Sequence, residues 1–175
     1  MEFKILQTNV ATQKLTVGTA LHFESWITGF VDGEGCFYVA VNRRAKMNLK
    51  LEVIPSFSIS QKKHSIKQLQ QIAVYFQGGG LRYCSKDGTY KYETRKLDHI
   101  IQYVLPHFHQ FPLQTEKRND FEKFHTICSL IKKSEHLNKN GLSQIIEIAY
   151  QMNNAGQNRK TAKKELLQII NELKV

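Results

Sequence analysis

The stretch Ile27-Thr-Gly-Phe-Val-Asp-Gly-Glu-Gly35 carries the strongest structural signal in the chain. Gly29 and Gly33 are four residues apart, so on a helix they share one face and let a second helix approach closely. Because each glycine inside a helix costs roughly 1 kcal/mol relative to alanine, two of them indicate close backbone packing. Glu34 ends this helix, where a symmetry-related copy would bring a second Glu34 near it.

Two carboxylates at short range repel one another and raise each other's pKa. A divalent cation removes this repulsion, and hard oxygen ligands suit Mg²⁺. Paired metal ions are a known device for cleaving phosphodiesters. The alternative is a tight helix–sheet contact at the glycines and a solvated carboxylate at Glu34, although a helix C-terminus is an unfavourable place for negative charge.

Strand and helix patterns follow this stretch in a regular order. We expect a short helix Trp26–Glu34 capped by Ser25, followed by strands over Cys36–Asn42 and Lys50–Ser60. Further expected elements are a helix over Ser65–Phe76, a hairpin turning at Asp87-Gly88, and later helices with apolar stripes at Ile100/Val104, Phe121/Phe124/Cys128/Ile131, Ile145/Ala149/Met152 and Leu166/Ile170/Leu173.

The order predicts an α+β fold, α-β-β-α-β-β-α with one four-stranded antiparallel sheet, helices on one face and additional C-terminal helices. Two prolines qualify it. Pro55 is typical of a sheet edge or bulge, and Pro106 is expected to break its helix. On the hairpin, Tyr83, Tyr90 and Tyr92 share the apolar parity and are expected to pack in the core or on the sheet.

The charge points to a polyanionic partner, because 25 Lys and Arg against 15 Asp and Glu give a net charge of +10. Three widely spaced cysteines favour reduced thiols and therefore an intracellular setting, either an organelle (chloroplast or mitochondrion) or a bacterial cytoplasm. Because no apolar run approaches the roughly 20 residues of a membrane span, no membrane partner is expected. Residues 1–20 are interpreted as an arm or leader and residues 21–175 as a single domain.

Ile27–Gly35 resembles the LAGLIDADG motif, and the wider run WITGFVDGEGCF (residues 26–37) is similar to the form common in intron-encoded homing endonucleases. Three later stretches extend the resemblance over about residues 21–173: Ser60-Gln-Lys62, the basic segment Phe111–Phe121, and His136–Asn153 with Asn158-Arg-Lys-Thr161. Thr28 in place of a small alanine and Glu34 in place of aspartate are departures that the family tolerates.

The resemblance implies a role for each matching residue. Glu34 and the carbonyl of Gly33 would hold the metal, Gln61 would order active-site water, and Lys117 would lie near the scissile phosphate, with Arg118 as the alternative. Asp32 is not a metal ligand in the family. The expected dimer interface comprises Ile27, Gly29, Phe30 and Gly33.

The expected DNA-binding residues are the cations and the solvent parity of the sheet, together with a loop that contacts phosphate. They are Arg43, Arg44, Lys50, Ile54, Ser56, Ser58, Arg82, Cys84, Lys86, Lys91, Glu93, Arg95, Arg159, Lys160 and Thr161. Arg159 and Lys160 are expected to touch only phosphate.

One motif copy per chain implies a homodimer and a near-palindromic target. The implied function is site-specific cleavage of double-stranded DNA, in which Mg²⁺ activates the attacking water. Two other functions remain open on the same scaffold: a maturase that binds intron RNA, and a DNA-binding regulator that does not cleave.

Overall fold

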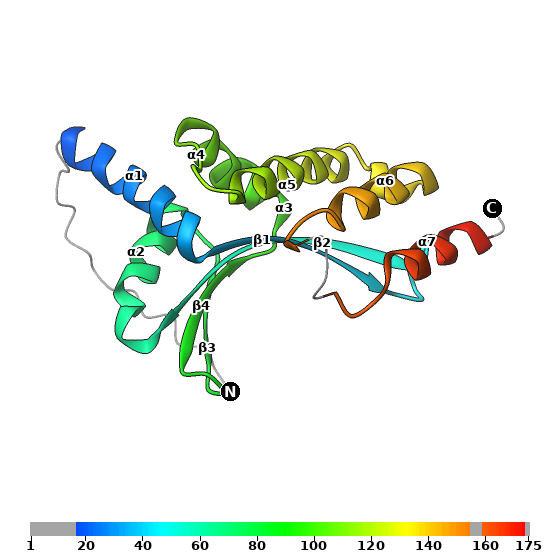
Figure 1. Ribbon diagram of the computed structural model, residues 1–175, viewed down its shortest axis with the longest axis horizontal. Helices are drawn as coiled ribbons and strands as arrows, with labels where there is room; N and C mark the ends of the chain where they lie inside the picture. Colours follow the sequence, from blue (N-terminus) through cyan, green and yellow to red (C-terminus); the bar gives the residue numbers. More distant parts are fainter. Residues whose placement is uncertain (1–16, 155–158, 174–175) are drawn as a thin grey trace.

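The computed structural model describes residues 17–154 and 159–173, and its elements follow the predicted order (Figure 1). Its sheet has the strand order β1-β2-β4-β3 with antiparallel neighbours, so the α+β prediction is confirmed. The strands of the sheet are β1 (Gly35–Arg43), β2 (Leu51–Lys62), β3 (Gly80–Cys84) and β4 (Thr89–Thr94). Two helices precede or interrupt them in the chain, α1 (Val17–Glu34) and α2 (Ile66–Tyr75). The later helices are α3 (Leu97–His99), a π-helical turn (Ile100–Val104), α4 (Leu105–Gln110), α5 (Lys117–Lys132), α6 (Lys139–Ala149) and α7 (Lys163–Glu172).

The first helix is longer than predicted. It begins at Val17, so Ser25 lies inside α1 rather than at its cap, and the proposed arm overlaps the helix at residues 17–20. Residues 1–16 of the arm lie outside the described residues. The apolar positions Ile27 and Val31 turn inward and are fully buried, which fixes the helix against the sheet.

The prediction that Pro106 breaks its helix was wrong. Helical backbone runs from Leu97 to Gln110, with Pro106 in the first turn of α4 directly after the π-helical turn. In the preceding π-helical turn Leu105 N–H donates to the carbonyl of Ile100, five residues earlier, so Pro106, which has no N–H to donate, lies where the spacing changes from π- to α-helical.

Pro55 lies where β2 has a neighbour on only one side. Its pairing partner is Val39 of β1, whereas β4 pairs with β2 only over residues 57–62. A residue without an N–H is compatible with this half-open position, as the sequence predicts for an edge.

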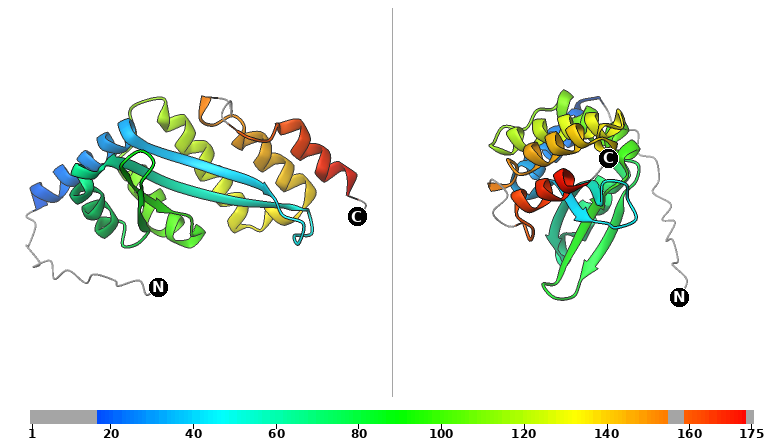
Figure 2. Two further views of the ribbon diagram at one scale, coloured as in Figure 1. Left: turned by 90° about the horizontal axis from the view of Figure 1, so that it is seen from below. Right: turned by 90° about the vertical axis from the view of Figure 1, so that its right-hand side faces the viewer.

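Two hydrophobic clusters join the helices to one face of the sheet. The larger cluster lies beneath α1, α2, α4 and α5 and contains a stack of aromatic rings that includes Phe37, Phe57 and Phe108. The smaller cluster joins the far ends of β1 and β2 to α6 and α7, through residues such as Val41, Leu142 and Leu166. Figure 2 shows the two long strands running beneath the helices from the end of α1 to the turn near α7.

The predicted apolar parity of the hairpin holds at the centre of the sheet and fails toward the hairpin tip. Tyr92 is fully buried, but Leu81 and Tyr83 are 38% and 47% exposed. Tyr83 instead packs against Tyr90 across the hairpin, with ring centroids 4.9 Å apart. The described helices include none that is both long and apolar enough to cross a membrane.

Candidate active site

The junction between α1 and β1 presents Glu34 and Gly33 to solvent. The last four carbonyl groups of a helix have no partner within it. A Cβ placed on Gly33 would meet nothing within 4 Å, so the side of the turn at Gly33 is open within the described chain. A carboxylate beside free carbonyl oxygens is the hard-oxygen set that Mg²⁺ prefers.

One chain carries only part of such a metal site. Within residues 17–154 and 159–173, no three His, Cys, Asp or Glu side chains gather as a complete ligand set would. Glu34 and the Gly33 carbonyl could therefore hold a divalent cation only together with further ligands.

Lys117 reaches this junction from the first residue of α5. Its ammonium donates to the carbonyl oxygen of Gly35, with Nζ and O 2.5 Å apart, although the two residues are 82 positions apart in the chain. Arg118 points elsewhere and pairs with Glu122 one turn along α5, at 3.2 Å. Of the two candidates, Lys117 is the cation that meets the end of α1.

Gln61 lies near the same junction through the register of the sheet. Gly35 pairs with Ile59, and Gln61 follows Ile59 by two residues on β2. Two residues of a strand span about 7 Å, so the register places Gln61 beside the last turn of α1. The backbone positions of the three predicted catalytic residues, Glu34, Gln61 and Lys117, thus lie around the α1–β1 junction, on α1, β2 and α5.

The outer edge of β1 is covered by three side chains from distant segments. Lys117, Asn153 and Arg159 donate to the carbonyl oxygens of Gly35, Phe37 and Val39, at 2.5, 2.9 and 2.7 Å. Successive outward carbonyls of an edge strand otherwise invite pairing with another chain. These three donors satisfy them and align the C-terminal segments with the site.

Sequence reasoning gave no role to Asn153 or to the residue that holds it. Asn153 has a positive φ of 51°, and its N–H donates to the Asp120 carboxylate of α5 at 3.1 Å. An asparagine tolerates this left-handed conformation better than most residues do. The pattern around Asn153 contains no signal for a partner 116 positions away.

Arg159, which is predicted to touch only phosphate, makes several contacts within the chain. Its guanidinium lies 4.8 Å from the ring centroid of Tyr38 and 4.7 Å from that of Tyr150. It also donates to the carbonyls of Val39 and Ala149, both at 2.7 Å. Arg159 therefore fastens the 159–161 segment to β1 and α6, while Lys160 is exposed and Asn158 lies outside the described residues.

Arg43, another residue of the predicted DNA-binding set, is also paired within the chain. Its position on β1 shares the parity of Val39 and Val41, which face the helices, and its guanidinium pairs with Glu165 of α7. Arg44, one residue later, is in the turn and pairs with Glu52 of β2 at 2.6 Å. Lys50 is exposed in the same turn.

The face of the sheet opposite the helices carries most of the remaining predicted residues. Glu93 pairs there with Lys91 at 3.1 Å and with Arg95 at 2.9 Å. Partial burial opposes ionisation, but the hydrogen bonds and charges of these two cations hold the pKa of Glu93 below its ordinary value. Ser56 and Ser58 lie on this face but are only 7% and 5% exposed, so the larger neighbouring side chains dominate its surface.

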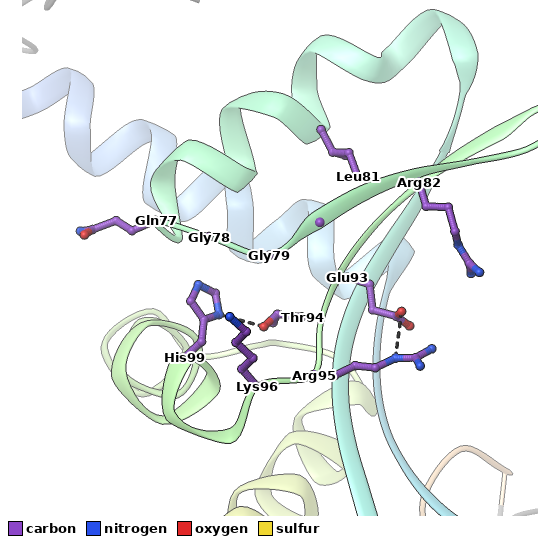
Figure 3. A pocket seen from close by; sticks show the side chains of 11 residues that line it. Gln77, Gly78, Gly79, Leu81, Arg82, Glu93, Thr94, Arg95, Lys96 and His99 are labelled. Carbon is purple, nitrogen blue, oxygen red and sulfur yellow. Dashed lines mark hydrogen bonds and ion pairs between the residues drawn. The ribbon is translucent and has the colours of Figure 1, made fainter. Parts of the chain in front are cut away.

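A pocket of about 650 Å³ opens beside the base of the β3–β4 hairpin (Figure 3). Arg82, Arg95 and Lys96 line it together with the Gly78–Gly80 loop and Glu93. Three cations against one carboxylate make this part of the sheet edge attractive to a polyanion. Ile54, Cys84 and Lys86 complete the predicted set, with Lys86 exposed in the hairpin turn.

The outer face of α1 has no partner within the described chain. Cβ atoms placed on Gly29 and Gly33 would meet nothing within 4 Å, which excludes the tight contact inside one chain that the glycines alone allowed. Trp26 is 39% exposed on the same side and stacks on Phe30 at 5.0 Å between ring centroids. Ile27 was wrongly assigned to this face, because it is fully buried in the core of its own chain.

The inner face of α1 accounts for the unusual threonine of the motif. Thr28 donates to the carbonyl of Phe111 at 3.0 Å, and its hydroxyl oxygen lies 3.2 Å from Nε2 of His107. Nδ1 of His107 lies 2.9 Å from the Tyr75 hydroxyl. Burial lowers the pKa of His107 to about 4, so the imidazole is neutral at physiological pH and serves as part of this hydrogen-bonded network.

The chain is similar to curated proteins from other organisms. The probable intron-encoded endonuclease 2 of Neurospora crassa is 32% identical over 124 residues, which cover 71% of this chain and 26% of that protein. A probable intron-encoded DNA endonuclease of Mycosarcoma maydis is 28% identical over 142 residues, covering 81% and 50% of the two proteins. The chain thus spans between about a quarter and a half of these curated relatives.

Solved structures show the same fold. The crystal structure of the homing endonuclease I-TnaI superposes with a TM-score of 0.73 at 36% identity and covers 85% of this chain and 96% of that one. I-SmaMI bound to an uncleaved DNA target in the presence of calcium ions superposes with a TM-score of 0.74 at 25% identity, covering 85% and 49%. The LAGLIDADG endonuclease family model matches residues 27–128, more than half of the sequence. The chain belongs to the LAGLIDADG endonuclease family.

Proposed function

We propose that two copies of this chain form a Mg²⁺-dependent endonuclease that cuts a long, near-palindromic site in double-stranded DNA. The observation that carries the proposal is the convergence of Glu34 and Lys117 at one end of α1, where Lys117 contacts the backbone directly after Glu34. A carboxylate at a helix C-terminus is electrostatically unfavourable unless a cation accompanies it, and the exposed face of α1 leaves room for a second copy.

The residues of the junction divide the work of phosphodiester hydrolysis. Glu34 and the Gly33 carbonyl would hold Mg²⁺, and the bound ion would supply positive charge at the phosphate and lower the pKa of water. The ammonium of Lys117 stabilises negative charge that develops on the phosphate oxygens. The Gln61 amide can donate to one water molecule and accept from another, which suits it to orient the attacking water.

DNA recognition is assigned to the open face of the sheet. An antiparallel sheet can enter the major groove, where each base pair shows a distinct pattern of donors and acceptors. Arg82 and Lys91 project from paired positions on β3 and β4 and are suited to read base edges. Lys160 and the cations of the turns contact phosphate and contribute affinity without sequence preference.

Assembly through α1 follows from its unpartnered glycine face. Close packing of two α1 helices at Gly29 and Gly33 brings two copies of Glu34 together about a twofold axis. The nearly complete coverage of the I-TnaI chain supports a unit of this length. In light scattering, the parent protein is expected to be dimeric at micromolar concentration and Gly33→Leu to shift to monomer, because leucine overpacks the contact.

The test of function uses a plasmid that carries the exon–exon junction of the intronless host gene, incubated with the full chain with and without Mg²⁺. Double-strand cleavage at the junction that requires Mg²⁺ supports the proposal. Binding without cleavage of that DNA would instead favour a regulator, and binding of the intron transcript alone would favour a maturase. A matched plasmid with the intron inserted is the control, because the insertion disrupts the site.

A further inference from the structure

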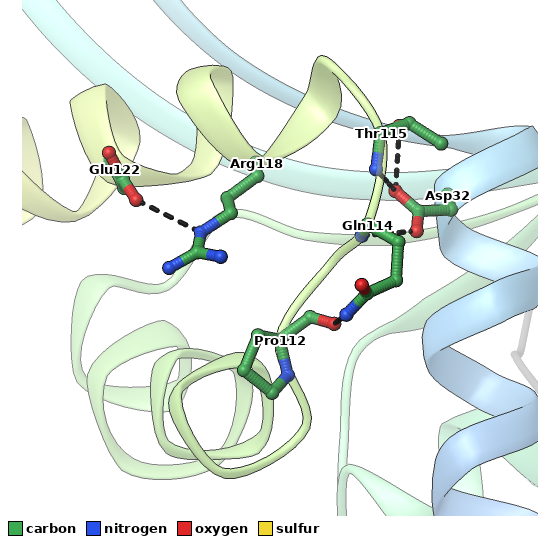
Figure 4. A network of polar contacts seen from close by, with 6 residues as sticks. All are labelled: Asp32, Pro112, Gln114, Thr115, Arg118 and Glu122. Carbon is green, nitrogen blue, oxygen red and sulfur yellow. Dashed lines mark hydrogen bonds and ion pairs between the residues drawn. The ribbon is translucent and has the colours of Figure 1, made fainter.

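The other acidic residue of the motif, Asp32, has a role inside the chain that metal binding does not explain. Its carboxylate accepts hydrogen bonds from Gln114 N–H at 2.7 Å, from the Thr115 hydroxyl at 2.8 Å and from Thr115 N–H at 3.4 Å (Figure 4). These donors lie in the loop between α4 and α5, more than 80 residues along the chain. Both carboxylate oxygens are thus used by this loop.

Thr115 transmits this contact to the start of α5. Its hydroxyl oxygen accepts from Lys117 N–H at 3.2 Å, and its carbonyl accepts from Arg118 N–H at 3.0 Å. The residue directly before α5, Glu116, makes no side-chain cap. Thr115 therefore takes the place of the missing cap, and the negative charge of Asp32 stands near the positive end of the α5 dipole.

Three successive hydrogen bonds link the two sides of the α1–β1 junction. Asp32 holds Thr115, Thr115 holds the backbone of Lys117, and the ammonium of Lys117 returns to Gly35, three residues beyond Asp32. In the sequence, Glu34 lies between Asp32 and Gly35, the two ends of this chain of hydrogen bonds. A lysine side chain has four rotatable bonds, so the position of its ammonium depends on where its backbone is fixed.

We propose that Asp32 and Thr115 are positioning residues that hold Lys117 at the metal-binding end of α1. The proposal rests on the proposed function and adds to it a reason for the second acid of the motif. Misplacing a catalytic group by about 1 Å can cost about 100-fold in rate. Releasing the loop at residues 112–116 should therefore slow the chemical step while leaving DNA binding to the sheet unaffected.

The test compares single-turnover cleavage and target affinity for Thr115→Val, Thr115→Ser and Asp32→Asn. Valine has the shape of threonine without the hydroxyl, so Thr115→Val should slow cleavage about 10- to 100-fold with an unchanged Kd for DNA. Serine keeps the hydroxyl and should retain nearly the parent rate, and Asp32→Asn should fall between them. Glu122→Gln is the matched control, because it removes a carboxylate that contacts α5 only through the exposed Arg118.

A double-mutant cycle separates positioning from general stability. In a Lys117→Ala background, Thr115→Val should cost nothing further, because the group that it positions is already absent. A full parent rate for a folded Thr115→Val protein, or equal losses with and without Lys117, would overturn the proposal.

Hydrogen exchange provides a readout that does not depend on cleavage. The Gln114 and Thr115 amides should be protected in the parent and should exchange faster in Asp32→Ala. If the parent cuts no DNA but this protection is present, the proposed function fails, whereas the contact of Asp32 with the 114–115 loop is supported. Unprotected Gln114 and Thr115 amides in an active parent would refute the positioning role of Asp32 and Thr115 and leave the proposed function standing.

Discussion

Lys117 and Arg159 make the same bond in two different surroundings. Each donates to an outward carbonyl of β1, Gly35 in one case and Val39 in the other, only four residues apart. Arg159 is enclosed by two tyrosine rings and donates to a second carbonyl, so its two terminal nitrogens are both used within the chain. Lys117 has one such bond and lies next to the exposed Glu34. The difference shows that surroundings, rather than the charge alone, separate a structural cation from one available for chemistry.

The largest expected effect is on the cleavage rate of Lys117→Ala. Loss of a cation that stabilises the transition state costs about 100- to 1,000-fold, whereas removal of one hydrogen bond to Gly35 should change the free energy of unfolding by about 1 kcal/mol or less. Single-turnover cleavage and urea unfolding of the same preparation measure the two quantities. A variant that unfolds readily but cleaves normally when folded would place Lys117 with Arg159 as a structural residue.

Arg159→Ala should show the opposite behaviour. Two hydrogen bonds from a charged group and the contacts with Tyr38 and Tyr150 are lost, so the protein should be destabilised by about 2–4 kcal/mol. The folded variant should keep a cleavage rate close to that of the parent. Arg159→Lys is the control, since it retains the charge but cannot bridge two carbonyls in the same way. A stable Arg159→Ala protein with weakened DNA binding would restore the original phosphate assignment.

His107 of α4, which packs against the inner face of α1, makes stability depend on pH. On the inner face, the pKa of His107 is lowered to about 4 by burial, from an ordinary value of 6.5. Because the folded state binds this proton less tightly than the unfolded state does, the stabilisation is complete above pH 6.5 and is lost as pH falls toward 4. These pKa values predict that the free energy of unfolding falls by about 2 kcal/mol between pH 7.5 and pH 5.

Urea unfolding at the two pH values, with His107→Gln as the control, measures this effect. The control removes the titrating group, so it should show a smaller pH dependence than the parent. Equal pH dependence in both proteins would mean that His107 is not the buried neutral group described above.

The smallest effects concern DNA affinity. Lys160→Ala should weaken binding to all sequences alike and reduce the slope of log K against log salt by about one unit. Arg82→Ala should instead relax preference at particular base pairs by about 1–3 kcal/mol each. Binding to single-base target variants at two salt concentrations distinguishes them. A base-specific effect of Lys160→Ala would contradict the proposal that the loop contacts phosphate while the sheet reads bases.

The same residues show how far the sequence alone reaches. The glycine spacing predicts an open face on α1, and alternation predicts the parity of β2, because both depend on local periodicity. Ile27 was misplaced because adjacent helix positions differ by about 100°, and the position beside a glycine face can belong to the core. The β1 edge contacts of Asn153 and Arg159 are fixed by partners more than 100 residues away, so no local pattern identifies them.

The catalytic residues show a similar division. Glu34, Gln61 and Lys117 were assigned through the family resemblance, and the structure brings their positions to one junction. The role of Asp32 required the Thr115 contact, which only the folded chain shows. The sequence thus predicts which residues take part, and the tertiary contacts show how Lys117 and Asp32 are held.

The most direct test of the central claim measures cleavage and binding of Glu34→Gln beside the parent on the same exon-junction DNA in Mg²⁺. Glutamine has nearly the shape of glutamate but no negative charge, so cleavage should fall by at least about 100-fold. The Kd for the target should stay within a few-fold of the parent, because Glu34 makes no base contact in this account. Equal cleavage rates for Glu34→Gln and the parent would contradict the assignment of Glu34 as the metal-binding acid.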